Sequence, residues 1–155
     1  MAKTAKNSQV IGWRERVSLP DWGIKRIKAK IDTGARTSAI HVSTLEELDD
    51  GSVRFEVVVR EGPSRKTSWV TARPVRRTTI KSSSGHRQKR IVIVTRIRIG
   101  EIEREVELTL VSRKGMLCRM LVGRTALSGI LVDPRRINLV SALPRTKSNQ
   151  KEDRQ

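Results

Sequence analysis

Apolar and polar residues alternate along most of the middle of this chain, which is the pattern of β-strands with one buried face. The cleanest case is residues 102–110, which places Ile102, Val106, Leu108 and Leu110 on one face and Glu103, Glu105, Glu107 and Thr109 on the other. Residues 91–99 are rich in Ile and Val, so Gly100-Glu101 between the two segments predicts a tight hairpin. Residues 53–60 form another strand candidate, which ends at a turn signal over residues 61–63.

Helical signals are short by comparison. Ser43 and Glu46 have the spacing of a capping box, but Asp50-Gly51 soon ends the helix that this box would begin. Residues 124–128 could form about a turn and a half before Gly129. Several short strands, many turns and little helix predict an all-β barrel or sandwich.

The size of the chain, 155 residues, predicts one domain, which we place at residues 10–144 between disordered tails at residues 1–9 and 145–155. Hydrophobic residues make up 36% and charged residues 32%, and no apolar run is long enough to span a bilayer. The first nine residues do not form a secretory signal, and the single Cys118 cannot make an internal disulfide. We therefore expect a soluble protein with a cytoplasmic location.

The charge is high and uneven. The net charge is +17, from 33 Lys and Arg against 16 Asp and Glu. Residues 60–90 contain ten basic residues and one acid, a net of +9, whereas residues 43–56 contain five acids and one Arg, a net of −4. Such a field attracts polyanions, so RNA, a ribosome surface and an acidic peptide are candidate partners. Aromatic residues that could stack on bases are few and scattered.

The sharpest local motif is Asp32-Thr33-Gly34-Ala35, which directly follows the alternating segment Ile27 to Ile31. A carboxylate at the end of an apolar strand is held rigidly, and Gly34 lets the backbone turn and approach a partner closely. Alone, Asp-Thr-Gly is also typical of an ordinary turn. A second motif, Leu121-Val122-Gly123-Arg124, follows near the other end of the chain.

Together these two motifs resemble those of the retropepsins, in which an apolar-Gly-Arg strand lies beneath an Asp-Thr-Gly-Ala turn. The flanking segments at residues 12–15, 30–41 and 129–134 resemble a bacterial retropepsin-like family that is often labelled ATP-dependent zinc protease. The resemblance covers about residues 10–134 and implies an acid-protease-like barrel with one short helix after the Leu-Val-Gly-Arg strand.

The resemblance also implies an aspartic peptidase with Asp32 as its catalytic carboxylate. Because the chain has one Asp-Thr-Gly, the implied enzyme is a homodimer in which two copies of Asp32 share a proton and activate water. Thr33 would brace the two turns, and Gly34 would face the substrate. The basic segment suggests an acidic, Glu-rich substrate.

Retropepsins cover their cleft with a mobile hairpin, and its counterpart here would have its tip at Ser83, Ser84, Gly85 and His86. An ordinary hairpin turn explains these residues equally well. Two departures from the retroviral pattern stand out. Arg36 occupies the position of the acid that pairs with the Arg after the Gly, and residues 45–73 hold extra length that could form a hairpin or a lid.

The residues themselves do not support the zinc and ATP of the family label. The soft metal ligands His41, His86 and Cys118 are scattered, and a phosphate-binding Gly-rich loop is absent from the sequence. We therefore expect no cofactor and no metal, with His41 and Cys118 in structural roles. Three rival functions remain open: a retropepsin-fold module that binds RNA or the ribosome, a zinc-dependent hydrolase, and a regulatory partner of a peptide-modifying enzyme.

Overall fold

The computed structural model describes residues 9–81, 83–112 and 117–142, and almost all of their regular structure is β-strand. The elements in chain order are β1 (Gln9–Leu19), η1 (Pro20–Trp22), β2 (Ile24–Ile31), β3 (Ser38–Glu47), β4 (Val53–Arg60), β5 (Lys66–Ala72), β6 (Arg76–Lys81), β7 (Arg87–Ile99), β8 (Ile102–Val111), β9 (Met120–Val122), η2 (Arg124–Ala126) and β10 (Ile130–Ile137). The elements η1 and η2 are single turns of 3₁₀-helix.

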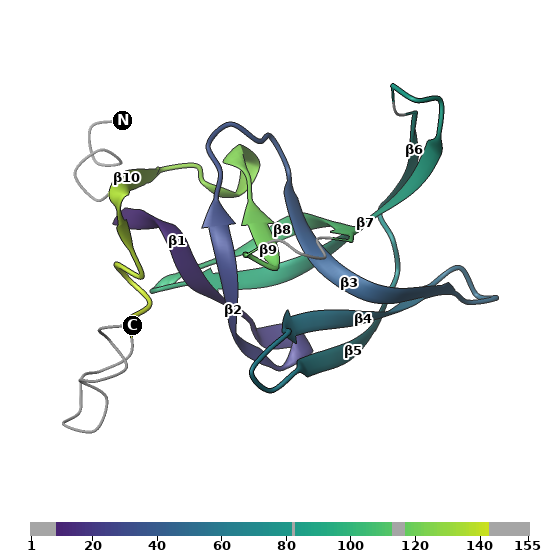
Figure 1. Ribbon diagram of the computed structural model, residues 1–155, viewed down its shortest axis with the longest axis horizontal. Helices are drawn as coiled ribbons and strands as arrows, with labels where there is room; N and C mark the ends of the chain where they lie inside the picture. Colours follow the sequence, from purple (N-terminus) through teal and green to yellow (C-terminus); the bar gives the residue numbers. More distant parts are fainter. Residues whose placement is uncertain (1–8, 82, 113–116, 143–155) are drawn as a thin grey trace.

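The strands form a small closed barrel (Figure 1). Eight of them follow the hydrogen-bonded order β10-β1-β2-β9-β3-β8-β7-β6. Ser18 of β1 also pairs with Arg98 of β7, which closes the run from β1 to β7 on itself. Strands β4 and β5 form a hairpin attached through β3. The predicted all-β barrel is confirmed, and so is the short helix after the Leu-Val-Gly-Arg strand, which is η2.

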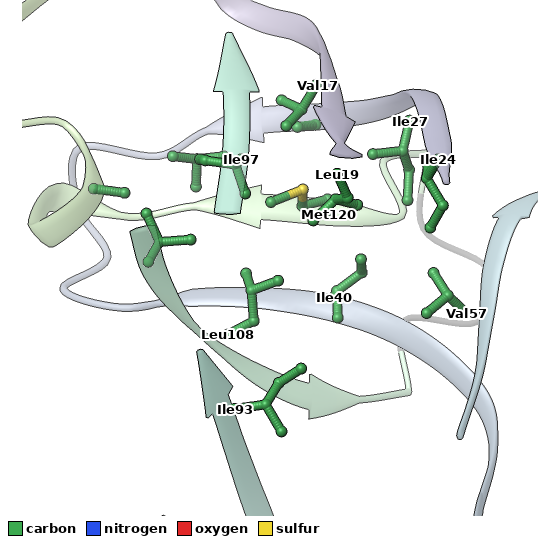
Figure 2. Packing of buried hydrophobic residues seen from close by; sticks show 14 of the residues in the cluster. Val17, Leu19, Ile24, Ile27, Ile40, Val57, Ile93, Ile97, Leu108 and Met120 are labelled. Carbon is green, nitrogen blue, oxygen red and sulfur yellow. The ribbon is translucent and has the colours of Figure 1, made fainter. Parts of the chain in front are cut away.

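The hydrophobic core fills the barrel with side chains from strands that are far apart in the sequence. Ile27 of β2, Ile40 of β3, Leu108 of β8 and Met120 of β9 have no exposed surface, and Figure 2 shows them pointing into the same space. Each buried aliphatic side chain of this size contributes about 1.5–3 kcal/mol relative to its exposed form. The alternation that predicts the strands therefore also supplies much of the energy that closes the barrel.

The hairpins expected from the sequence are present. Strands β7 and β8 pair from Ile99 and Ile102 onwards, with the turn at Gly100-Glu101, where Gly100 has a φ of 60°. The extra length at residues 45–73 forms the β4–β5 hairpin together with the end of β3. On β8 the predicted alternation holds except at Thr109, which lies between β3 and β7 and is buried.

The helix predicted at Ser43 to Glu46 is wrong, because these residues belong to β3. Glu46 and Glu47 pair with Arg54 and Val53 of β4, so backbone pairing with a neighbouring strand overrides the local capping signal. Asp50 does end the segment, but as a hairpin turn: its carboxylate Oδ1 accepts a hydrogen bond from the N–H of Ser52 (3.0 Å).

A buried carboxylate ties β1 to the residues after β10. Glu15 has no exposed surface, and its two oxygens accept four hydrogen bonds. The donors are the backbone N–H groups of Gly12 (2.6 Å), Leu139 (2.9 Å) and Val140 (3.3 Å) and the hydroxyl of Ser141 (2.7 Å). A Cβ at Gly12 would lie 2.5 Å from the carbonyl oxygen of Arg136, so only glycine lets these two segments approach.

The expected tails cannot be compared with the structure: residues 1–8 and 143–155 lie outside the described residues, and Gln9 already belongs to β1. The domain limits therefore stay predictions. No helix in the described part of the chain is long and apolar enough to cross a membrane.

Candidate functional site

Asp32 lies at the end of β2, at the point where the parallel strands β2 and β9 stop pairing. Ile31 pairs with Val122, and the N–H of Asp32 donates to the carbonyl oxygen of Val122 (2.9 Å). The side chain is partly buried, whereas Thr33 and Gly34 are exposed. The two sequence motifs thus meet through backbone pairing, which places the carboxylate at a fixed point on the barrel rim.

The turn after Asp32 is organised by its own carboxylate. The N–H of Gly34 donates to Oδ1 of Asp32 (2.9 Å), and the N–H of Ala35 donates to the carbonyl oxygen of Asp32 (3.2 Å). This is the side-chain-to-backbone bonding by which Asp commonly stabilises turns. The geometry is therefore that of a stable turn.

Gly123 lets the turn and the segment after β9 pass each other at backbone contact distance. Its N–H donates to Oγ of Ser38 (3.0 Å), and the N–H of Arg124 donates to the carbonyl oxygen of Ala35 (2.7 Å). A Cβ at Gly123 would lie 2.7 Å from the carbonyl carbon of Thr37 and 2.9 Å from the carbonyl oxygen of Ala35. Glycine is required at this position because the neighbouring backbone leaves no space for a Cβ.

Arg124 also holds the turn, in a way that the sequence did not reveal. Its Nη1 donates to the carbonyl oxygens of Thr33 (3.2 Å) and Gly34 (3.1 Å). Arg36, which replaces the acid of the retroviral pattern, is exposed and contributes its carbonyl oxygen to the N–H of Thr125 (3.1 Å). The guanidinium of Arg124 thus binds backbone carbonyls of its own chain.

The predicted flap tip lies in the turn between β6 and β7. Ser83 to His86 are exposed, Gly85 has a φ of 86°, and the β6–β7 hairpin projects beyond the barrel in Figure 1. The hairpin is present as expected, and its action as a flap stays a prediction.

The positive charge of residues 60–90 is partly neutralised in the fold, because some of these basic side chains pair with acidic ones. Glu47 accepts hydrogen bonds from Nζ of Lys89 (2.6 Å) and Nε of Arg77 (3.0 Å), and these bonds lower the pKa of Glu47. Arg76 pairs with both carboxylate oxygens of Glu107. The acidic residues 43–56 thus contact the basic residues 60–90 through Glu47, and Glu107 of β8 binds a further cation.

A second cationic surface, apart from the β6–β7 hairpin, lies where β1 and β2 face the β4–β5 hairpin. A groove of about 920 Å³ lies there, and seven of its twelve lining residues are basic. We call it the basic groove: Arg16, Lys25, Arg26, Lys28, Val59, Arg60, Glu61, Gly62, Pro63, Lys66, Leu117 and Arg119 line it. Its one carboxylate, Glu61, has Arg65 at 3.8 Å.

The cations of this groove repel one another. Burial is the main cause that lowers the pKa of Lys28, and the charges of Arg16 and Arg14 lower it further. The pKa of Arg16 is lowered by burial first and then by Arg26 and Arg14. Sequence reasoning missed this site because its residues come from four segments, although the alternating basic residues on β1 and β2 were a visible signal.

Replacing Lys28 with glutamine should therefore raise the free energy of unfolding by about 0.5 kcal/mol, because Arg16 loses a like charge directly across the strand pair. Urea unfolding at low ionic strength measures the change. Lys89→Gln, which removes a partner of Glu47, is the contrasting variant and should give no gain. A loss of stability in Lys28→Gln would contradict the repulsion.

The candidate metal ligands do not gather. His41 and Cys118 are both buried, as expected for structural roles, whereas His86 lies at the exposed hairpin tip. Within the described ranges, no group of three His, Cys, Asp or Glu side chains is placed to hold a metal ion.

Comparison with known proteins yields one matching family, several curated relatives and a similar solved structure. The family model described as "RimB-like: Retropepsin-like aspartic endopeptidase RimB" matches residues 10–141. A probable α-L-glutamate ligase from Shewanella pealeana is 40% identical over 132 residues, which are 83% of this chain and 29% of that protein. One from Desulfotalea psychrophila is 39% identical over 131 residues, 81% of this chain and 28% of that protein. This chain thus spans less than a third of the length of these curated relatives.

Among solved structures, a Legionella pneumophila protein of unknown function matches with a TM-score of 0.70 and 26% identity, covering 86% of this chain and 98% of that one. It supports the fold and names no activity.

The names of the curated relatives correct the expected function. The relatives at 33–40% identity are named ligases, so the interpretation of this chain as a hydrolase, whether aspartic peptidase or zinc-dependent, is wrong. The family description does name an endopeptidase, and the two findings disagree. A shared fold and turn do not establish a shared chemistry, so the endopeptidase activity in the family description is not assigned to this chain.

Proposed function

This chain belongs to the RimB-like family of retropepsin-like proteins, and we propose that it acts beside an α-L-glutamate ligase as the domain that binds the glutamate-bearing peptide. Repeated addition of α-L-glutamate to an acceptor lengthens an acidic peptide. A domain with a net charge of +17 and a groove lined by seven cations is suited to hold such a product. A cytoplasmic location stays a prediction.

The observation that carries this proposal is the groove itself. Its described lining residues include seven cations and one carboxylate, and burial and mutual repulsion lower the pKa of Lys28 and Arg16. A cationic surface of this kind is stabilised when an anion binds, because the ligand supplies the opposite charges that the fold does not. The relatives' names indicate glutamate as the source of those charges.

Binding of peptides that differ only in their tails tests the proposal. Exposed ion pairs contribute about 0.2–1 kcal/mol each, so the full chain should bind a peptide ending in four glutamates about tenfold more tightly than one ending in four glutamines. Fluorescence anisotropy at low ionic strength gives both affinities, and added salt should weaken the binding of the glutamate tail.

A second measurement connects binding to ligation. Addition of the chain to the Shewanella pealeana ligase relative should change the length distribution of the glutamate tails, read by mass spectrometry. Equal affinity for the two tails together with an unchanged length distribution would overturn the proposed function.

A further inference from the structure

Each wall of the basic groove carries two like charges directly opposite each other. On the β1–β2 wall Arg16 pairs in register with Lys28, and on the β4–β5 wall Arg60 pairs in register with Lys66. Like charges at directly opposed positions destabilise a strand pair. Two such pairs that face one groove destabilise the protein when no ligand is bound. A ligand with negative charges near both walls would remove this repulsion.

An extended peptide meets this requirement by its geometry. Successive side chains of an extended chain point to opposite sides, and side chains on the same side repeat about every 6.8 Å. A run of consecutive glutamates therefore presents carboxylates alternately to the left and to the right. A peptide with glutamate only at every second position presents them to one side alone.

We propose that the basic groove binds an extended run of α-linked glutamates, with alternate carboxylates on the β1–β2 wall and on the β4–β5 wall. Lys28 and Lys66 are the specificity-determining residues, one on each wall. This inference rests on the proposed function and adds where the glutamate run lies and which sequence of residues it prefers. Val59, Pro63 and Leu117 supply apolar surface for the methylene groups of the glutamates.

The composition of the groove favours a peptide over a single-stranded nucleic acid. None of the described residues that line it is aromatic, whereas proteins that bind single strands stack bases on aromatic side chains. The exposed Trp69 lies outside the lining, with the guanidinium of Arg54 over its ring at 4.0 Å. RNA is therefore a competitor in the test rather than the ligand we infer.

Paired variants of the full chain locate the site. Lys28→Gln/Lys66→Gln removes one cation from each wall. Lys81→Gln/Arg87→Gln is the matched control: it removes the same total charge from the basic β6–β7 hairpin, outside the groove. The affinity for a four-glutamate tail should fall about tenfold in the groove variant and less than about twofold in the control. Thermal unfolding of both variants verifies that they remain folded.

Two peptides with equal charge examine the two-wall geometry. Four consecutive glutamates should bind wild type several-fold more tightly than four glutamates separated by alanines, and the groove variant should lose most of this preference. Equal binding of the two peptides to wild type would overturn the two-wall arrangement.

The remaining outcomes separate the two proposals. If wild type prefers glutamate over glutamine tails but both double variants bind like wild type, or the hairpin variant alone loses affinity, the groove inference fails and the proposed function survives. If wild type does not distinguish glutamate from glutamine tails, the groove inference fails, and the proposed function fails with it when the tail-length distribution is also unchanged. If a single-stranded RNA binds the groove more tightly than the glutamate peptide does, and loses affinity in Lys28→Gln/Lys66→Gln, the ligand class is wrong.

Discussion

Replacing Gly123 with alanine is expected to lower the free energy of unfolding by about 3 kcal/mol and to loosen the Asp32 turn. The added Cβ would lie 2.7 Å from the carbonyl carbon of Thr37, and that atom belongs to backbone that cannot rotate away. Relief requires the turn to separate from the segment after β9, which weakens the hydrogen bond from the N–H of Arg124 to Ala35. Denaturant unfolding measures the loss.

The matched control is the same substitution at Gly34, in the Asp32 turn that the segment of Gly123 contacts. A Cβ there would meet only the side-chain Oδ1 of Asp32, at 3.2 Å, which can move by a few tenths of an ångström. We expect Gly34→Ala to cost less than about 1 kcal/mol. If the two substitutions have equal effects, the close approach at Gly123 does not hold the two motifs together.

Glu15→Gln is expected to lower the free energy of unfolding by about 3 kcal/mol, because an amide cannot accept the hydrogen bonds that two carboxylate oxygens accept. Each carboxylate oxygen of Glu15 accepts hydrogen bonds from two of the four donors. The NH₂ group of a glutamine, at the position of either oxygen, would therefore face two N–H or O–H groups. At this chain length the loss corresponds to a fall in melting temperature of about 6–12 °C.

Glu105→Gln on the exposed face of β8 makes the same chemical change without the donors and should stay within about 0.5 kcal/mol of wild type. Hydrogen exchange gives a sharper local readout. The amides of Leu139 and Val140 should exchange faster in Glu15→Gln, since they donate to that carboxylate. Unchanged exchange of these two amides, together with unchanged stability, would show that the Glu15 carboxylate does not hold β1 to the residues after β10.

The Asp32 motif establishes a fold without establishing a chemistry. The Asp32 turn, Gly123 and Arg124 form one hydrogen-bonded unit, and this unit explains the retropepsin-like fold. The same bonds are those that any stable turn of this shape would need, so they do not establish peptide hydrolysis. We propose instead that this chain holds acidic peptides, on the basis of the ligase names of its relatives and the cations of the basic groove.

Local patterns allowed prediction of four of the ten described strands, β2, β4, β7 and β8, but not of every segment. The alternation of Ile27, Ala29 and Ile31 and that of residues 102–110 gave correct strands, because a side chain in a strand is buried or exposed according to its own position. Ser43 to Glu46 were wrongly assigned to a helix because the decisive contact, pairing with β4, comes from residues later in the chain.

The candidate sites divide in the same way. Asp32 and Gly123 were recognisable because each motif is contiguous, and their meeting followed from the family resemblance. The basic groove was not recognisable, since Arg16, Lys28 and Lys66 are brought together only by the barrel and the β4–β5 hairpin. The emphasis on residues 60–90 also missed that Glu47 and Glu107 neutralise part of that charge.

The sequence by itself determined the strands with a clear apolar pattern, the turn at Gly100-Glu101 and the two motifs of the Asp32 unit, because these depend on residue type and on neighbours within a few positions. Only the tertiary structure decided which acidic and basic side chains pair and which cations gather in the basic groove. It also decided that Glu15 is buried with donors from Leu139 to Ser141. Electrostatic and hydrogen-bond energies depend on distances in space, and in a closed barrel those distances are set by strands far apart in the chain.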